Sequence, residues 1–216
     1  MLRRFFARLG QLETPPPWGL NAGLISVIAA FAALVFGSNL TLTVYCSAPA
    51  NAPYCQALNF AVPPSVWFLG WTLGAIALVA FIFITRRTPA ERAGLRLGGL
   101  DTSIFWVLLV SIGLAVTLDL IVIQFTTGAL EPELQSLRQQ QPETLTWMLA
   151  FLFMVLAQPV AEELVFRGIL QPALRQNLGA WPGYLVASFT YAAFHLLAYS
   201  PATSTSDTLT YGFALP

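Results

Sequence analysis

The sequence predicts an all-α protein, a polytopic bundle of about five transmembrane helices whose N-terminus is cytoplasmic. Of its 216 residues, 56% are apolar and only 9% are charged, whereas a soluble domain carries about 25% charged residues. No charged residue occurs between Glu13 and Arg86. Because a bilayer core about 30 Å thick needs roughly 20 apolar residues in a helix, this composition favours a membrane protein.

Five apolar runs approach the length of a membrane helix. They cover residues 20–44, 60–85, 103–127, 145–170 and 182–199. The last two runs include polar groups, so hydropathy alone ranks them below the first three.

The chain is therefore expected to have four parts. The basic N-terminal segment is interpreted as a retained arm because the apolar run after it is too long for a signal-peptide core. The predicted parts are a cytoplasmic arm (1–19), three generic transmembrane helices with their loops (20–144), a hairpin of two motif-bearing helices (145–199) and a polar tail (200–216).

Arginine residues predict the orientation of the bundle. They gather in the N-terminal arm, in the loop 86–96 and after the fourth run, whereas the loops between are uncharged (46–59) or mostly acidic (131–143). The positive-inside rule then places the arm and the loop 86–96 in the cytoplasm and the C-terminal tail outside. The formal net charge is zero, which gives no basic surface for a nucleic acid.

Both cysteines, Cys46 and Cys55, lie in the first loop predicted to be outside. The outside is the oxidising face, which favours a disulfide, while two unpaired thiols are the alternative. Their spacing matches no metal-binding motif.

Six polar residues fall at membrane depth: Asp119, Glu162, Glu163, Arg167, Tyr191 and His195. Ionisable groups at this depth are functional candidates, since each must be paired or hydrated. If the fourth helix enters the membrane near Trp147, Glu162 lies about 22 Å further along it, inside the bilayer core. Pro159 is predicted to kink this helix and to let water reach the carboxylates.

The fourth and fifth helices are predicted to form an antiparallel hairpin. Asn177 and Gly179 suit a helix end, and Pro182 suits a first helical turn. A turn near Gly179 leaves arms of about equal length to Glu162 and to His195, the single histidine of the chain. The two side chains are then expected at the same depth, with Tyr191 one turn before His195 on the same face.

A histidine facing glutamates in a low-dielectric site favours acid–base chemistry. Glu163 and Arg167 are four residues apart and can form a salt bridge, whereas Glu162 points about 100° away from Glu163. One carboxylate could then take a proton from water while His195 hydrogen-bonds a substrate carbonyl. The alternatives are a solvated helix interface and a packed interior histidine.

Asp119 and the tryptophans are interpreted as structural residues. Asp119 is interpreted as forming an interhelical hydrogen bond or pairing with an arginine rather than as a catalytic group. Packing or interfacial anchoring is the interpretation for the tryptophans near the ends of the runs, which are Trp67, Trp71, Trp106 and Trp147.

The residues "EELVFRG" and "YAAFH" resemble the paired motifs of the CAAX-protease and bacteriocin-processing (Abi, type II prenyl endopeptidase) family of intramembrane proteases. The family carries E-E-x-x-x-R on one membrane helix and F-x-x-x-H on the next. The resemblance covers roughly residues 145–199. It implies cleavage of peptide bonds of a membrane-associated protein or peptide in an integral membrane protein, here expected in a bacterial plasma membrane.

The resemblance also implies roles for the site residues. Glu162 and Glu163 would activate water, Arg167 would order the pair, and His195 would position the water, polarise the carbonyl or bind an ion. Tyr191 stands where the family usually has phenylalanine and is a supporting residue. No cofactor is certain. A divalent metal such as zinc would take Glu162, Glu163 and His195, although adjacent glutamates chelate awkwardly.

Besides Tyr191, the chain departs from the family in a second respect. Family members carry a later helix whose histidine and asparagine or aspartate form an oxyanion hole, and this sequence has no second histidine. We expect a truncated reading frame. The alternatives to a complete protease are a non-catalytic membrane scaffold or bacteriocin self-immunity protein, and a proton-coupled carrier that uses Asp119, Glu162 and Glu163.

Overall fold

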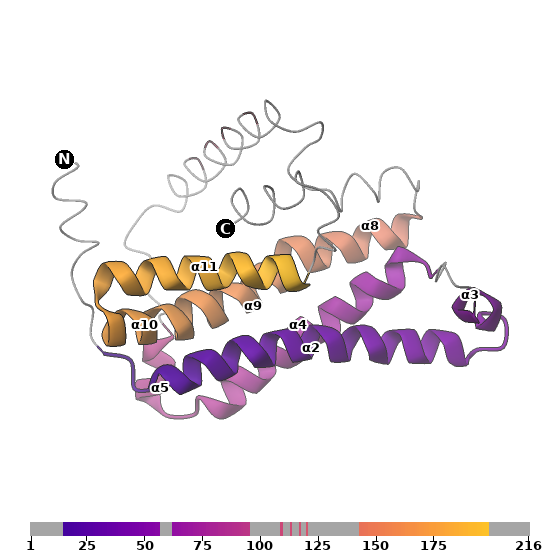
Figure 1. Ribbon diagram of the computed structural model, residues 1–216. Helices are drawn as coiled ribbons and strands as arrows, with labels where there is room; N and C mark the ends of the chain where they lie inside the picture. Colours follow the sequence, from indigo (N-terminus) through magenta and orange to yellow (C-terminus); the bar gives the residue numbers. More distant parts are fainter. Residues whose placement is uncertain are drawn as a thin grey trace.

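The computed structural model describes residues 15–56, 62–95 and 143–198, together with residues 109, 113, 117 and 120. Every regular element in these stretches is helical (Figure 1), which confirms the predicted all-α class. Three helices there are long and apolar enough to cross a membrane: Leu20–Ser47, Pro64–Thr85 and Thr144–Leu178. The protein is therefore an integral membrane protein.

The first two long helices, α2 (Leu20–Ser47) and α4 (Pro64–Thr85), run antiparallel and pack along each other (Figure 1). Glycine permits this close approach. A Cβ atom on Gly74 would lie 2.9 Å from the carbonyl carbon of Ala33, and one on Gly70 would lie 2.8 Å from the Cα of Ser38. Small residues at such interfaces bring helix backbones together in membranes, where lipid removes the hydrophobic drive to associate.

A disulfide closes the loop between these helices. It joins Cys46, in the last turn of α2, to Cys55 in the short helix α3 (Ala52–Gln56), with a Cα–Cα distance of 5.9 Å. Of the two alternatives that the sequence left open, the structure has the disulfide.

The loop after α4 leads into α5 (Pro89–Gly94), which begins with a capping box between Thr88 and Glu91. Hydrogen bonds from the Thr88 backbone N–H and hydroxyl hold the pKa of Glu91 below its usual range. Gly94 packs against Trp18, the residue two places before α2 begins. The indole N–H of Trp18 donates to the Ile169 carbonyl at 3.1 Å, which ties the start of α2 to the motif-bearing helix.

That helix is continuous from Thr144 to Leu178 and so extends eight residues beyond the predicted 145–170. Its hydrogen-bonding pattern changes four times along its length. The segments are α8 (Thr144–Phe151), the π-helix η1 (Leu152–Ala157), α9 (Gln158–Glu162), the π-helix η2 (Glu163–Leu170) and α10 (Gln171–Leu178).

The predicted hairpin is confirmed. Gly179, with φ of 94°, ends α10 in a conformation that favours glycine, and α11 (Ala180–Ala198) returns beside α10 and η2 (Figure 1). Helix α11 matches the predicted fifth span, yet it is not among the three that meet the length and hydropathy requirements. Its polar residues, which include Ser188, Thr190 and His195, lower its hydropathy.

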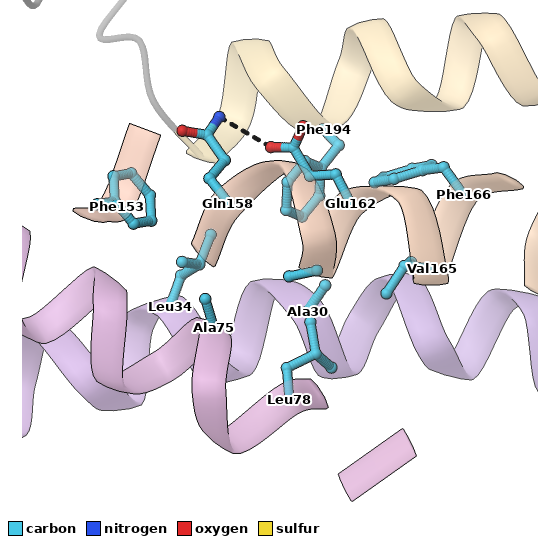
Figure 2. A pocket seen from close by; sticks show the side chains of 11 residues that line it. Ala30, Leu34, Ala75, Leu78, Phe153, Gln158, Glu162, Val165, Phe166 and Phe194 are labelled. Atoms are coloured by element: carbon cyan, nitrogen blue, oxygen red, sulfur yellow. Dashed lines mark hydrogen bonds between the residues drawn. The ribbon is translucent and has the colours of Figure 1, made fainter. Parts of the chain in front are cut away.

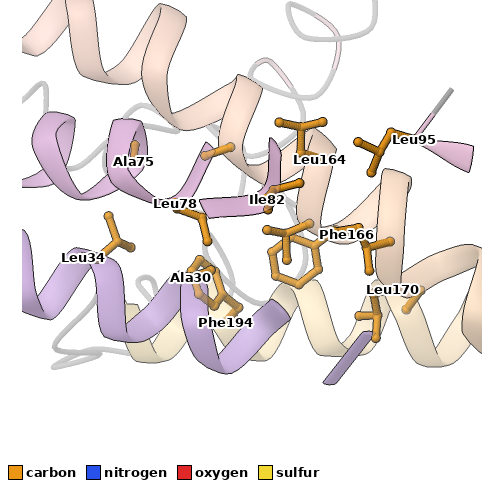
Figure 3. Close-up of a cluster of buried hydrophobic side chains, with 14 of the residues drawn as sticks. Ala30, Leu34, Ala75, Leu78, Ile82, Leu95, Leu164, Phe166, Leu170 and Phe194 are labelled. Carbon is orange, nitrogen blue, oxygen red and sulfur yellow. The ribbon is translucent and has the colours of Figure 1, made fainter. Parts of the chain in front are cut away.

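The buried core lies where α2, α4, η2 and α11 meet (Figure 3). Figure 3 shows Leu34 and Ala30 of α2, Leu78 and Ile82 of α4, and Phe194 of α11 around the same cluster. The motif-bearing helix is thus packed from both sides, which fixes the position of its polar residues.

Some predictions fall outside the described residues. These are the roles of Asp119 and Trp106, the structure of the polar tail, and all but four residues of the third span at 103–127. Trp71 is described, and it packs against Phe68 and Phe153 with ring centroids 5.5 and 5.4 Å apart.

Candidate active site

Glu162 and His195 meet across the helix hairpin. Glu162 ends α9 and His195 lies in the last turn of α11, and the Oε1 atom of Glu162 is 3.5 Å from Nε2 of His195. Both side chains are nearly enclosed, with exposed fractions of 12% and 6%. The equal arms of the hairpin predicted this shared depth from the sequence.

Two further side chains donate to the Glu162 carboxylate. The Tyr191 hydroxyl donates to Oε2 at 2.7 Å, and the Gln158 amide donates to Oε1 at 2.9 Å. Each carboxylate oxygen therefore has its own donor, one from the facing helix and one from the preceding turn of its own helix. Such pairing offsets the cost of placing a carboxylate at membrane depth.

Glu163 and Arg167 form the salt bridge that their spacing predicted, with 3.1 Å between Glu163 Oε1 and Arg167 Nη1. Their side chains are 56% and 75% exposed, in contrast to the enclosed Glu162. The sequence interpretation had His195 facing both glutamates, but Glu162 is the one at hydrogen-bonding range. Adjacent residues on a helix point about 100° apart, so a single histidine does not face both.

The His195 ring is held by its own helix and by aromatic neighbours. Its Nδ1 atom lies 3.2 Å from the Tyr191 carbonyl oxygen, and its ring centroid is 4.3 Å from that of Tyr191. A carbonyl only accepts, so this contact is a hydrogen bond when Nδ1 carries the proton. In the neutral ring Nε2 then presents its lone pair toward Glu162.

The π-helical segments explain how the carboxylates are presented. Pro159 has no N–H, and just before it the Gln158 N–H bonds five residues back to the Phe153 carbonyl. After the glutamates, the Gln171 N–H likewise bonds to the Phe166 carbonyl. π-helical turns are rare in proteins, but many of those that occur lie at functional sites. The helix therefore changes its hydrogen-bonding register on both sides of Pro159, and the predicted kink stays a prediction.

An open groove of about 250 Å³ runs beside the two glutamates. One wall belongs to the motif-bearing helix and the other to α11. The lining residues are Pro159, Glu162, Glu163, Phe166, Arg167, Gln171, Tyr184, Ala187, Ser188 and Tyr191. All the predicted site residues except His195 line this groove. His195 lies behind the lining and contacts two of the lining residues, Glu162 and Tyr191.

Glu162 also borders a second, small apolar cavity of about 20 Å³ on the side of α2 and α4. Figure 2 shows Gln158 and Glu162 joined by a hydrogen bond above Leu34, Ala75 and Leu78, with Phe153 and Phe166 on either side. Gln158 and Glu162 are the polar side chains in the lining of this cavity. The carboxylate therefore separates an apolar pocket from the open groove.

The described residues do not assemble a three-ligand metal site. Within residues 15–56, 62–95 and 143–198, no group of three His, Cys, Asp or Glu side chains is placed to hold a metal ion. Glu162 and His195 supply two ligands, while Glu163 is engaged by Arg167. Among the described residues, two ligands are therefore in place for the divalent metal that the sequence left open, and metal use stays a prediction.

Sequence reasoning missed two groups that shape the site. Gln158, four residues before Glu162, carried a usable signal, since residues at this spacing share a helix face. Phe166 lies within the quoted motif, and its ring centroid is 4.8 Å from that of Tyr191 and 5.2 Å from that of Phe194. These edge-on contacts hold α11 against η2.

Comparison with known proteins supports the resemblance. The comparison with curated proteins found no match, and neither did the comparison with solved structures. A family model does match: residues 144–215 correspond to the family described as type II CAAX prenyl endopeptidase Rce1-like. The match includes both motifs and extends past the predicted limit at residue 199 into the tail. The C-terminal third of this membrane protein is therefore similar to the Rce1-like family.

Proposed function

We propose that this protein is an intramembrane endopeptidase that hydrolyses a peptide bond of a membrane-associated protein or peptide. The supporting observation is the pair of enclosed groups, Glu162 and His195, brought together from two helices at the edge of an open groove. The Rce1-like match over the same helices points to the same class of reaction. A membrane-embedded peptidase of this kind would act in a bacterial plasma membrane, like the bacterial relatives of the family.

In the proposed mechanism Glu162 is the general base. A direct hydrogen bond between Glu162 Oε1 and His195 Nε2 is weak at 3.5 Å, and both atoms are acceptors when the ring is neutral and Nδ1 is protonated. A water molecule that donates one hydrogen to each atom satisfies both. Its lone pairs then point away from the two acceptors, and one of them attacks the substrate carbonyl carbon.

The proton balance follows from this arrangement. The Glu162 carboxylate takes a proton from water as the water oxygen bonds to the scissile carbonyl carbon. The tetrahedral intermediate then breaks its C–N bond, and the Glu162 carboxyl gives that proton to the leaving nitrogen. The products are a carboxylic acid and an amine, and the Glu162 carboxylate is regenerated. No step of this scheme passes through a metal ion.

Glu163 and Arg167 take a different role in the proposal. Their salt bridge is largely exposed along the groove, away from the enclosed Glu162. The pair therefore orients the substrate backbone, with Arg167 supplying donors for substrate carbonyl groups. Gln171, one turn further along, adds a polar group to the same wall of the groove.

The test is hydrolysis by the purified full chain in lipid nanodiscs. The probe is a pool of lipid-anchored peptides with randomised central residues, half of them carrying a farnesylated cysteine near the C-terminus. In ¹⁸O-water, mass spectrometry is expected to find new C-termini that contain ¹⁸O. Glu162→Gln is expected to lower the rate by about 10²–10⁴-fold.

Glu143→Gln is the matched control, because Glu143 is an exposed glutamate at the start of α8 whose side chain caps no backbone group. Its rate is expected to equal that of the wild type. Equal rates for Glu162→Gln and the wild type, or no ¹⁸O-labelled product from the wild type, would contradict the proposal. Metal dependence is tested in the same assay by adding 1,10-phenanthroline, and retained activity is expected.

A further inference from the structure

Gln158 occupies a distinctive position beside Glu162. Its amide nitrogen lies 2.9 Å from Glu162 Oε1, the same oxygen that lies 3.5 Å from His195 Nε2. Its side chain borders the apolar cavity (Figure 2). Tyr191, the donor to the other carboxylate oxygen, borders the groove. The two donors therefore hydrogen-bond to the carboxylate from opposite sides.

The cavity side is where a carboxylate most needs such a donor. Apart from Gln158 and Glu162, the side chains that line the cavity are apolar, among them Leu34, Leu78 and Phe194. None of these can donate a hydrogen bond to the carboxylate. Hydrogen bonds to charged groups are stronger than those between neutral groups, and an unsatisfied charged acceptor in such surroundings is costly.

The backbone fixes Gln158 in place. Gln158 is the residue after η1, and its backbone N–H bonds to the carbonyl of Phe153, near the start of η1. Pro159 follows Gln158 in the sequence. Gln158 and Glu162 are four positions apart, which puts both side chains on one face of α9. This spacing places the Gln158 amide against the carboxylate, 2.9 Å from Oε1.

We propose that Gln158 is a positioning residue for the peptidase reaction, which holds Glu162 Oε1 beside His195 Nε2 from the cavity side. This inference rests on the proposed function, in which water binds between these two atoms. Without the Gln158 amide, the carboxylate turns away from His195, and the water is no longer aligned with the substrate carbonyl.

The first test does not depend on activity. Dicyclohexylcarbodiimide is an apolar reagent that enters membranes and reacts with carboxyl oxygens, and tandem mass spectrometry locates the adduct on Glu162 or on Glu163. Gln158→Met keeps the length of the side chain and removes the donor. It is expected to accelerate labelling of Glu162 several-fold, with labelling of Glu163 unchanged.

The second test separates positioning from substrate binding. In the peptide assay, Gln158→Met is expected to lower kcat by about 10-fold while KM stays within about twofold of the wild type. Gln158→Glu keeps the shape but places a second carboxyl group against Glu162, and kcat is expected to fall further. The matched control is Gln176→Met, since Gln176 is exposed on α10 and lines neither the groove nor the apolar cavity.

The outcomes are distinguishable. Wild-type rates of Glu162 labelling in both Gln158 variants overturn the inference, as does an unchanged kcat. A wild-type protein that cuts no peptide of the pool overturns the proposed function instead, and the labelling rates then decide by themselves whether Gln158 holds the carboxylate. If Gln158→Met lowers the unfolding temperature strongly, Gln158→Glu provides the comparison at equal side-chain volume.

Discussion

Two helix pairs in this protein handle polar side chains in opposite ways. In the α2–α4 pair the buried hydroxyl groups bond back to their own helix, as Ser38 does to the Leu34 carbonyl and Thr72 to the Phe68 carbonyl. In the hairpin of the motif-bearing helix with α11, the enclosed Glu162 has polar partners across the interface, the hydroxyl of Tyr191 and the ring of His195. Both pairs are packed into one core.

The difference separates structural polar groups from candidate chemical groups. A hydroxyl that bonds to its own helix is satisfied before the helices meet, so it adds little specificity to their association. A carboxylate at membrane depth cannot bond to the carbonyl groups of its own helix and depends on donor side chains, which for Glu162 come from its own helix and from α11. Enclosed polar groups that bond across helices are therefore the ones to test for function.

The largest expected effect comes from replacing His195, the partner of Glu162 in the cross-helix pair. His195→Gln removes the ring nitrogen that faces Glu162 and is expected to lower the rate of peptide cleavage about 10²-fold. Because Glu162 and His195 act on one water in the proposed mechanism, the double variant with Glu162→Gln is expected to be no slower than Glu162→Gln alone. Rate measurements for all four proteins form the cycle that checks this.

Independent, multiplicative losses in that cycle would contradict the shared role. Intact protein is verified by the elution volume in detergent and by the unfolding temperature, which should stay close to that of the wild type. His195 also stacks on Tyr191, so His195→Phe serves as a second variant that keeps a ring in the same place.

The next effect concerns stability and belongs to the α2–α4 pair. A Cβ atom on Gly74 would lie 3.2 Å from the Cα of Leu34 and 2.9 Å from the Ala33 carbonyl carbon, and neither backbone atom can move aside cheaply. Gly74→Ala is expected to lower the free energy of unfolding by about 1–3 kcal/mol. Unfolding in SDS, followed by tryptophan fluorescence, measures it.

Gly19→Ala is the control for this substitution, because no atom lies within 4 Å of a Cβ placed on Gly19. Its effect on the free energy of unfolding is expected to stay below about 0.5 kcal/mol. The substitution changes only how well residue 19 suits the N-cap position of α2. A cost for Gly19→Ala equal to that of Gly74→Ala would show that close helix packing is not what Gly74 provides.

A smaller effect is expected at Tyr191. Tyr191→Phe removes the hydroxyl that donates to Glu162 Oε2 but keeps the ring that packs on Phe166. Cleavage is expected to fall about 10-fold, in line with a hydrogen bond to a charged group. The residual activity stays measurable because the resembled family usually carries phenylalanine here. An unchanged rate would mean that Gln158 alone is sufficient to hold the carboxylate.

Much of this site could be predicted from the sequence because it depends on helix geometry and chain length. Equal arms around Gly179 predicted that Glu162 and His195 lie at one depth, and a spacing of four predicted the Glu163–Arg167 salt bridge. Both follow from a fixed rise and a fixed number of residues per turn. The turn itself was predictable because glycine favours a positive φ.

The rest depends on departures from that regular geometry. The π-helical segments η1 and η2 leave no periodic signal in the sequence, and they alter which way side chains point along ten or more residues. The cavity beside Gln158 is formed by α2 and α4, whose contacts with α9 depend on tertiary packing. Neither feature follows from composition or spacing.

The smallest expected effect tests the other side of the comparison. Thr72 is 2% exposed and its hydroxyl donates to the Phe68 carbonyl of the same helix at 2.7 Å. Thr72→Val removes that bond, but the carbonyl group keeps its place in the helix. The free energy of unfolding is expected to change by less than about 0.5 kcal/mol, and the rate of cleavage by less than about twofold. If Thr72→Val slowed cleavage as much as Tyr191→Phe, burial of any hydroxyl would matter, and a bond across the interface would cease to mark the functional helix pair.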